Sequence, residues 1–336
     1  MTDMELARIE RWLEVNVGLQ GTVTARKFAN GQSNPTYLLD VGGNQLVLRR
    51  KPPGLLLKSA HAVDREFRVQ KALEGTRVPV ARMVAFCEDE AVIGSAFYVM
   101  EHVEGRCVDD PRLPDISRDR KNIYFNEMGR VLADIHSVDL EAVGLSDYGP
   151  TGNYYRRQID RWTSQYHASA TGEISAMDQL MVILDRTCPK DDGLVSLVHG
   201  DYRIDNLMFA PDAAEIKAVL DWELSTLGHP FADIAGVIMQ WQMPPGEQGR
   251  GLRGVDRGIE GLPSDDDFVA AYCERMGIGQ IDNFGFYVGF CFFRMAAILQ
   301  GVKKRAIDGN ASDPERGLRL GAFVPLYAEA GLEALG

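Results

Sequence analysis

The sequence predicts an α+β protein of two lobes, with a small antiparallel sheet in the N-terminal lobe and a larger, mainly helical C-terminal lobe. The first reason is length, because 336 residues are more than one compact core normally holds. The second is a change of hydrophobic period: strand-like alternation is concentrated before residue 103, and helical spacing prevails after residue 104. We therefore expect an N-lobe at 1–103 and a C-lobe at 104–336.

In the N-lobe, apolar residues at helical spacing predict a first helix over 3–17. Between 22 and 50 the period falls toward two, and the turns NGQSN and GGN divide this stretch into three strands. A second helix is expected over 61–74, and the segments 78–89 and 91–103 predict two further strands. The expected N-lobe is an antiparallel sheet of about five strands, with one helix inserted after the third.

The C-lobe is expected to be helical except for a β-rich segment at 195–222, and the glycine-rich stretch 244–263 predicts a long loop. The most apolar stretch, Phe284 to Leu299, contains Arg294, so we expect it to be too short and too charged to span a bilayer. The N-terminal segment is charged and lacks an apolar signal-peptide core. Together these features predict a cytoplasmic protein that does not enter a membrane.

Composition excludes several classes of protein. Hydrophobic residues make up 45% and charged residues 25%, which is a globular mix and argues against disorder. The 48 acidic and 36 basic residues give a net charge of −12, so no general cationic face for nucleic acid is expected. The 5 cysteines include no C-x-x-C pair, which argues against a zinc site or a disulfide framework.

The sharpest chemical signal is LVHGDYRIDNLMF at 197–209, followed by AVLDWE at 218–223. In both segments apolar runs flank polar residues, as in short strands around a loop. Mg²⁺ prefers oxygen ligands from carboxylates and carboxamides and completes its shell with phosphate and water. Asn206 and Asp221 fit that ligand role.

Two further residues of the same loop suit phosphoryl transfer. Asp201 is available to orient a hydroxyl and accept its proton, and Arg203 is close enough in sequence to contact a transferring phosphoryl oxygen. The alternative is a polar hairpin in which aspartate and asparagine only form turns. Turn chemistry explains one such residue, but not H-G-D-x-x-x-x-N followed by an apolar strand that ends in D-W-E.

Together with a G-x-P-x-x-D pattern at 228–233, these motifs resemble the aminoglycoside phosphotransferase/choline kinase family, the small-molecule branch of the protein-kinase-like fold. The resemblance covers nearly the whole chain. It implies that Asp201 is the catalytic aspartate and that Asn206 and Asp221 hold magnesium. It also implies that His199 and Asp233 support the structure of this loop. The segments SNPTYLL, VLRRKPPG and REFRVQKAL are more closely similar to the phosphotransferase domain fused to some acyl-CoA dehydrogenases and its free-standing bacterial relatives.

The N-lobe would bind the nucleotide without a G-x-G-x-x-G loop, which the sequence lacks. A turn containing Gly31, Ser33 and Asn34 would cover the phosphates with backbone N–H groups and short polar side chains. Taken alone this turn is weak evidence, because Asn-Gly also forms ordinary hairpins. The segment from Glu101 to Val103 would be the hinge whose backbone groups meet the adenine edge.

The strand that presents a lysine in protein kinases carries arginine here. Strand alternation and the resemblance both place Arg49 at the lysine position, where arginine keeps the charge and adds a bidentate fork for phosphate oxygens. Glu66, on the second helix, is the expected ion-pair partner of Arg49. The alternative is a solvated surface pair that contributes under about 1 kcal/mol.

The predicted function is Mg²⁺-dependent transfer of the γ-phosphoryl group of ATP, bound between the lobes, to a hydroxyl of a small molecule. A protein kinase is disfavoured, because the short segment between Asp221 and Asp233 lacks A-P-E and leaves no room for a peptide-docking segment. A nucleotide-binding protein without turnover is the rival from another class, and Arg49 is its only support.

The acceptor is expected to be a small molecule, and the sequence leaves its identity and the oligomeric state open. An aminoglycoside-type antibiotic is one alternative. The closer resemblance favours a hydroxyacyl-CoA or a related metabolite, and cationic residues of the C-lobe suit such an anion, although ordinary surface charge explains them equally well. These cations are Arg156, Arg157, Arg161, Arg294, Lys303, Lys304 and Arg305.

Overall fold

The structure is a computed structural model that describes residues 1–28, 34–52, 62–246, 250–311 and 313–336. The chain divides into two compact units, each of which is described by itself. The first unit comprises Met1–Cys107, Asp139–Leu145 and Asn206–Ser225, and the second comprises Val108–Val138, Ser146–Asp205 and Thr226–Gly336. The division into domains at residue 103 stays a prediction.

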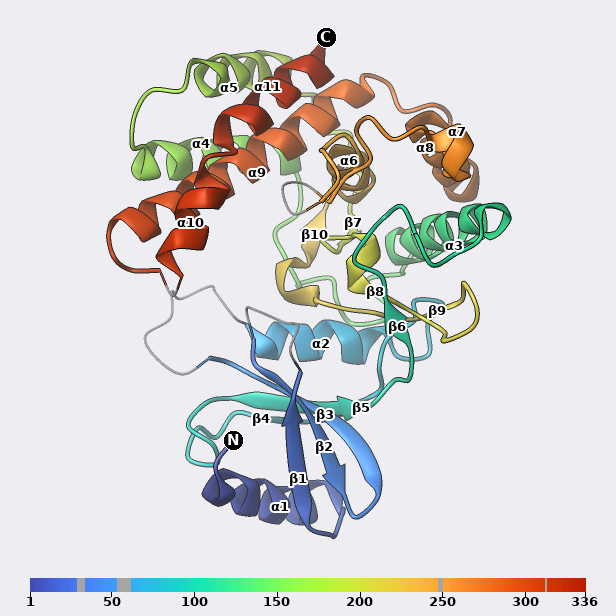
Figure 1. The fold of residues 1–336 in the computed structure, drawn as a ribbon, viewed down its shortest axis with the longest axis vertical. Helices are drawn as coiled ribbons and strands as arrows, with labels where there is room; N and C mark the ends of the chain where they lie inside the picture. Colours follow the sequence, from blue (N-terminus) through green and yellow to red (C-terminus); the bar gives the residue numbers. More distant parts are fainter. Residues whose placement is uncertain (29–33, 53–61, 247–249, 312) are drawn as a thin grey trace. The chain divides into compact units, whose positions relative to one another are not determined.

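The first unit contains the expected five-stranded antiparallel sheet, in the order β1-β2-β3-β5-β4. Figure 1 shows α1 on one face of this sheet and α2 on the other. The helix α2 follows β3 in the chain, so the predicted insertion is confirmed. The bounds are α1 Asp3–Val17, β1 Val23–Lys27, β2 Thr36–Val41, β3 Asn44–Arg50, α2 Val63–Leu73, β4 Met83–Cys87 and β5 Phe97–Glu101.

Alternation along the central strands gives the sheet two apolar faces, because neighbouring side chains of a strand point to opposite sides. Leu48 and Val99 are fully buried in one cluster with Ile9 of α1. Tyr98, the residue before Val99, belongs to a second cluster with Val63 of α2. The register of β3 is therefore fixed from both sides, and it decides which of two consecutive arginines faces α2.

A smaller three-stranded sheet, in the order β6-β8-β9, completes the first unit. Its strands are β6 Arg106–Cys107, β8 Leu207–Phe209 and β9 Ile216–Val219, and the single-turn 3₁₀ helices η1 Ile204–Asn206 and η2 Trp222–Leu224 lie beside them in the chain. The sequence predicted β structure at 195–222 but missed β6, which is only two residues long.

The second unit is mainly helical, with one two-stranded sheet formed by β7 Ser196–Val198 and β10 Thr226–Gly228. Figure 1 shows α9 running alongside α4, α10 and α11. The helices are α3 Arg118–His136, α4 Tyr154–Ser169, α5 Ser175–Thr187, α6 Phe231–Trp241, α7 Arg257–Glu260, α8 Asp265–Met276, α9 Phe284–Ile307, α10 Pro314–Gly321 and α11 Val324–Leu335. In the described part of the expected loop 244–263, the sequence did not predict the short helix α7.

The helix α9 corrects one expectation. It is 24 residues long and extends to Ile307, and among the described residues it alone is long and apolar enough to cross a membrane by length and composition. The expectation that the apolar stretch is too short was therefore wrong. Its neighbours bury 67% of the most apolar window. A Cβ on Gly285 would lie 2.2 Å from the carbonyl oxygen of Ala334, so glycine permits the close approach of α11. These contacts are those of a core helix.

Candidate active site

In the first unit, Arg49 connects two carboxylates that are distant in sequence. Its Nε lies 2.9 Å from Oε2 of Glu66, and its Nη2 lies 2.6 Å from Oδ1 of Asp221. The Glu66 side chain is 1% exposed and that of Arg49 is 12% exposed. The pair expected from the sequence is thus present, and its burial excludes the alternative of a solvated surface pair.

Strand register explains why Arg49 rather than Arg50 occupies this position. Arg49 is paired with Tyr98 across the ladder and shares its face, on the side of α2. Arg50 points to the opposite face, where its Nη1 lies 2.8 Å from Oε1 of Glu5 on α1. A shift of one residue in β3 would exchange the two arginines.

Burial and charge act against each other at Glu66. Burial raises the pKa of the Glu66 carboxyl to about 7, and the adjacent Arg49 opposes this rise. A buried carboxylate without a cation is costly, so the pair fixes the position of both side chains. The buried side chain of Asn34 adds a contact, since its Nδ2 donates to Oε2 of Glu66 at 3.4 Å. The other residues expected in the phosphate-covering turn, Gly31 and Ser33, lie outside the described residues.

The two expected metal ligands of the first unit lie at one end of an antiparallel strand pair. Asn206 directly precedes β8 and Asp221 follows β9, and the N–H of Leu220 donates to the carbonyl of Asn206 at 2.8 Å. The backbone at Asp221 is left-handed, with φ 64°, which is uncommon outside glycine. Such strain is concentrated at functional positions.

Both side chains offer the hard oxygen donors that suit Mg²⁺, which commonly takes one or two protein carboxylates and otherwise phosphate and water. Among the described residues no group of three or more His, Cys, Asp and Glu is arranged to hold a metal by protein ligands alone. The donor set therefore fits a magnesium site that phosphate completes. It does not fit an all-protein metal cage.

In the second unit, the loop that carries Asp201 is held through its backbone. The buried carboxylate of Asp233 accepts from the N–H of His199 at 2.7 Å and from the N–H of Gly200 at 2.8 Å. It also contacts Nε2 of His136 at 3.2 Å. The carboxylate thus supplies hydrogen-bond partners that the backbone of the turn lacks.

The side chain of Asp201 is also contacted within this unit. Nε of Arg203 lies 3.2 Å from Oδ1 of Asp201, and both side chains are 28% exposed. On the other side of the loop, Nη2 of Arg294 on α9 donates to the carbonyl of Gly200 at 2.9 Å. Sequence reasoning noted the charge of Arg294 but had no signal for its contact with this loop.

The expected hinge lies at the end of β5. The N–H of Glu101 donates to the carbonyl of Arg82 at 2.9 Å, and its carboxylate pairs with Arg82 at 2.5 Å. The N–H and side chain of Glu101 are therefore both engaged with Arg82, at the end of β5. Val103, two residues beyond β5, packs against the apolar cluster on the α2 face.

The structure divides the cations expected near an acceptor into two groups. Arg156 pairs with Asp185, and Arg157 donates to the carbonyls of Gly152 and Pro150. Lys304 pairs with Asp308 at 2.6 Å. By contrast, the guanidinium groups of Arg161 and Arg294 lie over the ring of Trp162. Their distances from the ring centre are 5.1 Å for Arg161 and 6.0 Å for Arg294.

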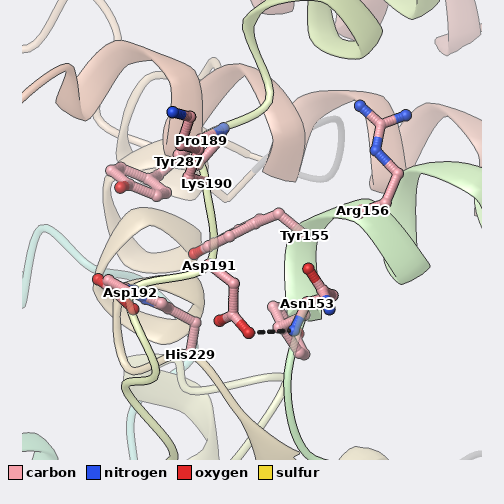
Figure 2. A pocket seen from close by; sticks show the side chains of 10 residues that line it. Asn153, Tyr155, Arg156, Pro189, Lys190, Asp191, Asp192, His229 and Tyr287 are labelled. Carbon is pink, nitrogen blue, oxygen red and sulfur yellow. Dashed lines mark hydrogen bonds and ion pairs between the residues drawn. The ribbon is translucent and has the colours of Figure 1, made fainter.

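A small pocket in the second unit is lined by residues of 153–156 and 189–192, with His229 and Tyr287 (Figure 2). His229 follows Gly228, and Gly228 pairs with Ser196 at one end of the β7–β10 ladder. The chain leaves β7 at the other end of this ladder and continues to Asp201. Figure 2 shows the carboxylate of Asp191 turned toward the backbone N–H of Asn153, from which it accepts a hydrogen bond at 2.8 Å. The pocket volume of about 30 Å³ leaves room for about two water molecules.

Two charged residues near Asp201 were missed as site residues. Asp205 contacts Arg203 and Arg250, at 3.0 Å and 2.8 Å. The position of Asp205, beside Asn206 in a loop rich in charge, was a signal that could have been used. Arg250 lies 45 residues away in the chain and gave no signal.

A five-stranded antiparallel sheet with a helix after its third strand, a mainly helical remainder and an H-G-D loop define a kinase-like phosphotransferase of the small-molecule class. The chain belongs to the phosphotransferase enzyme family, whose model matches residues 24–272.

Similar proteins carry two kinds of name. The chain is 46% identical over 307 residues to acyl-CoA dehydrogenase family member 10 of Mus musculus, covering 90% of this chain but only 29% of the mouse protein. It is also 46% identical to a protein of Ralstonia eutropha, provisionally named an aminoglycoside phosphotransferase, whose crystal structure superposes with a TM-score of 0.89 and 98% and 97% coverage of the two chains. Spectinomycin phosphotransferase, solved with ADP and spectinomycin, shares the fold at a TM-score of 0.65 and 11% identity, with 99% and 100% coverage.

Proposed function

We propose that the chain is an ATP- and Mg²⁺-dependent phosphotransferase that moves the γ-phosphoryl group to a hydroxyl of a small molecule. The observation that carries this proposal is the contact of Arg49 with both Glu66 and Asp221. This contact brings together a phosphate-binding cation, Arg49, its buried anchor, Glu66, and a metal ligand, Asp221. Arg49 and Asp221 are 172 positions apart in the chain. A cytoplasmic location, where ATP is available, is part of the proposal.

In this proposal, the nucleotide is held by residues of the first unit. Arg49 binds phosphate oxygens, and Glu66 keeps its guanidinium in place. Gly31, Ser33 and Asn34 cover the phosphates, and the backbone from Glu101 to Val103 meets the adenine. Magnesium at Asn206 and Asp221 would supply positive charge to the phosphate oxygens.

Asp201 acts as the base of the reaction. Its carboxylate accepts the proton of the acceptor hydroxyl while the hydroxyl oxygen forms a bond to the γ-phosphorus. The bond from that phosphorus to the bridging oxygen breaks, and ADP leaves with the electron pair. The exposed part of Asp201 leaves room for the hydroxyl.

We further propose an anionic acceptor of the hydroxyacyl-CoA class. Two guanidinium groups flank Trp162, and one of them, Arg294, reaches the residue before Asp201. This arrangement suits an anion with an apolar or aromatic part. The names of the similar acyl-CoA dehydrogenase family members point the same way. An aminoglycoside is the second candidate, supported by the name of the Ralstonia protein.

The experiment is an ADP-release assay on the full chain with ATP and Mg²⁺, across a kanamycin-type panel and a hydroxyacyl-CoA panel. We expect turnover with hydroxyacyl-CoA compounds and a loss on the order of 10²–10⁴ in rate for Asp201→Asn, because the amide keeps the shape but cannot accept the proton. Nucleotide affinity should stay nearly unchanged. Turnover of aminoglycosides alone would replace the acceptor class, and equal rates for wild type and Asp201→Asn would contradict the assigned base.

A further inference from the structure

A row of four charged side chains in the second unit starts at the proposed base. Arg203 contacts Asp201 through Nε at 3.2 Å and Asp205 through Nη2 at 3.0 Å. Oδ2 of Asp205 also lies 2.8 Å from Nη1 of Arg250, on the segment that follows α6. The guanidinium of Arg203 is thus held between two carboxylates, and the carboxylate of Asp205 between two guanidinium groups.

The two carboxylates differ in exposure. The side chain of Asp205 is 8% exposed, whereas that of Asp201 is 28% exposed. A buried carboxylate requires compensating charge and hydrogen bonds. Oδ2 of Asp205 obtains this charge and these hydrogen bonds from Arg203 and Arg250. Its Oδ1 is buried and has no hydrogen-bond partner within the described part of the chain. This is the position of an anchor, and the more exposed Asp201 is the one that can meet a substrate.

The fork of arginine makes this division of roles possible. The guanidinium is planar and rigid, so an arginine held at Nη2 keeps its Nε near one position. Asp205 holds Nη2 of Arg203 through a hydrogen bond, and the charge at Nε then lies 3.2 Å from Oδ1 of Asp201, as an ion pair. The backbone of the loop is fixed independently, by Asp233 at His199 and Gly200.

We propose that Asp205 is a positioning residue for the proposed base: it holds Arg203, supported by Arg250, so that Arg203 fixes the rotamer of the Asp201 carboxylate. This inference rests on the proposed function, in which Asp201 accepts a proton. It gives Arg203 a second role beside the phosphate contact expected from the sequence. It also assigns a function to a residue of the loop that the sequence analysis missed.

The main test is Asp205→Asn in the full chain, with ADP release measured with water as the acceptor, so that no identified substrate is needed. The amide keeps the size of the side chain but loses the charge that holds two guanidinium groups. We expect kcat to fall by about tenfold to a hundredfold, as for other small misplacements of a catalytic group. KM for ATP should change by less than about twofold.

A double-mutant comparison separates positioning from general damage to the fold. If Asp205 acts through Asp201, the change Asp205→Asn should cost little more in an Asp201→Asn background, because residues that act as one unit are not additive. A merely structural role predicts the same loss in both backgrounds. Arg203→Lys should reproduce the loss of kcat, because one ammonium nitrogen cannot reproduce the fork.

Asp110→Asn is the matched control, since it removes an aspartate–arginine pair from the same unit, with Arg112 as the partner. Its kcat should stay at the wild-type value. If Asp205→Asn does not fold, Arg250→Gln tests the same row from its more exposed end, with a smaller loss expected. If Asp201→Asn is inactive but Asp205→Asn keeps the wild-type kcat, the positioning role of Asp205 is overturned. Where Asp205→Asn does not fold, an unchanged kcat in Arg250→Gln has the same meaning. Absence of ADP release from wild type, both with water and with the two acceptor panels, would instead contradict the proposed function itself.

Discussion

Nη2 of Arg49 lies 2.6 Å from Oδ1 of Asp221, although the two residues are 172 positions apart in the chain. The same guanidinium is anchored by the buried Glu66 through Nε. A lysine at this position would have one nitrogen and could not hold both carboxylates with the same geometry. Arginine in place of the lysine of protein kinases therefore joins Glu66 to Asp221, and the binding of phosphate by Arg49 stays part of the proposed function.

The first prediction concerns this anchor. Arg49→Ala leaves the Glu66 carboxylate buried without a cation, so we expect a loss of roughly 3 kcal/mol in the free energy of unfolding. Glu66→Gln in the same chain should recover part of that loss at a pH where the Glu66 carboxyl is ionised, because the buried charge is then removed. Chemical denaturation of the single and double variants checks this. Additive losses would show that the pair contributes little.

The same position should affect nucleotide binding. Arg49→Lys is expected to retain part of the affinity for an ATP analogue and Arg49→Ala to lose about tenfold or more, as measured by calorimetry. Arg50→Lys is the control, since Arg50 pairs with Glu5 on the opposite face of the sheet. Equal affinity in all variants would place the phosphates elsewhere.

Asp221→Asn and Asn206→Ala should each raise the Mg²⁺ concentration that gives the half-maximal rate, by about tenfold or more. The first change removes the negative charge of a ligand, and the second removes an oxygen ligand from a hard cation. Direct binding of Mn²⁺ in the presence of an ATP analogue gives a readout apart from activity. Asp212→Asn, on the exposed turn between β8 and β9, should change neither quantity. A metal requirement that neither ligand variant alters would contradict the assigned site.

The third element open to test is Asp233, whose charge should make stability depend on pH. Burial alone would raise the pKa of its carboxyl, but hydrogen bonding and charge from His136, with further contributions from His199 and the N–H of Gly200, hold the pKa below its ordinary value. A depressed folded pKa stabilises the fold above the unfolded pKa near about 4, and this contribution is lost as pH falls through the folded value.

Asp233→Asn should therefore cost roughly 2–3 kcal/mol of stability at pH 7, and the difference from wild type should narrow below about pH 4. Unfolding by denaturant across the pH range measures this. Asp266→Asn, at an exposed position in the first turn of α8, should follow the wild-type profile. A difference that is constant with pH would show that the charge of Asp233 is not what matters.

The last prediction tests the acceptor side. Arg161→Gln and Arg294→Gln should each raise KM for a hydroxyacyl-CoA acceptor by about tenfold, with KM for ATP unchanged, because each removes a charge beside Trp162. Arg294→Gln should also lower kcat, since it frees the carbonyl of Gly200. Arg156→Gln is the control, because Arg156 is already paired with Asp185. An unchanged KM for the acceptor in both variants would rule out this surface.

The sequence by itself determined the fold class and the order of elements in the sheet lobe. Strand alternation and turn residues are local signals, so β1 to β5 and α2 could be predicted from short segments. The motif that contains Asp201 and Asn206 could be recognised equally well, because its functional side chains lie within a few residues of one another in the sequence. Strand register, also readable from alternation, selected Arg49 over Arg50.

Only the tertiary structure decided which distant charges meet. Asp221 contacts Arg49, and Arg250 contacts Asp205, through side chains that no local pattern relates. It also separated Arg294, which donates to the carbonyl of Gly200 beside Asp201, from Arg156, which is paired with Asp185. The physical reason is that a charge has the same sequence signature whether it is solvated or paired, and only burial and the position of the partner distinguish the two.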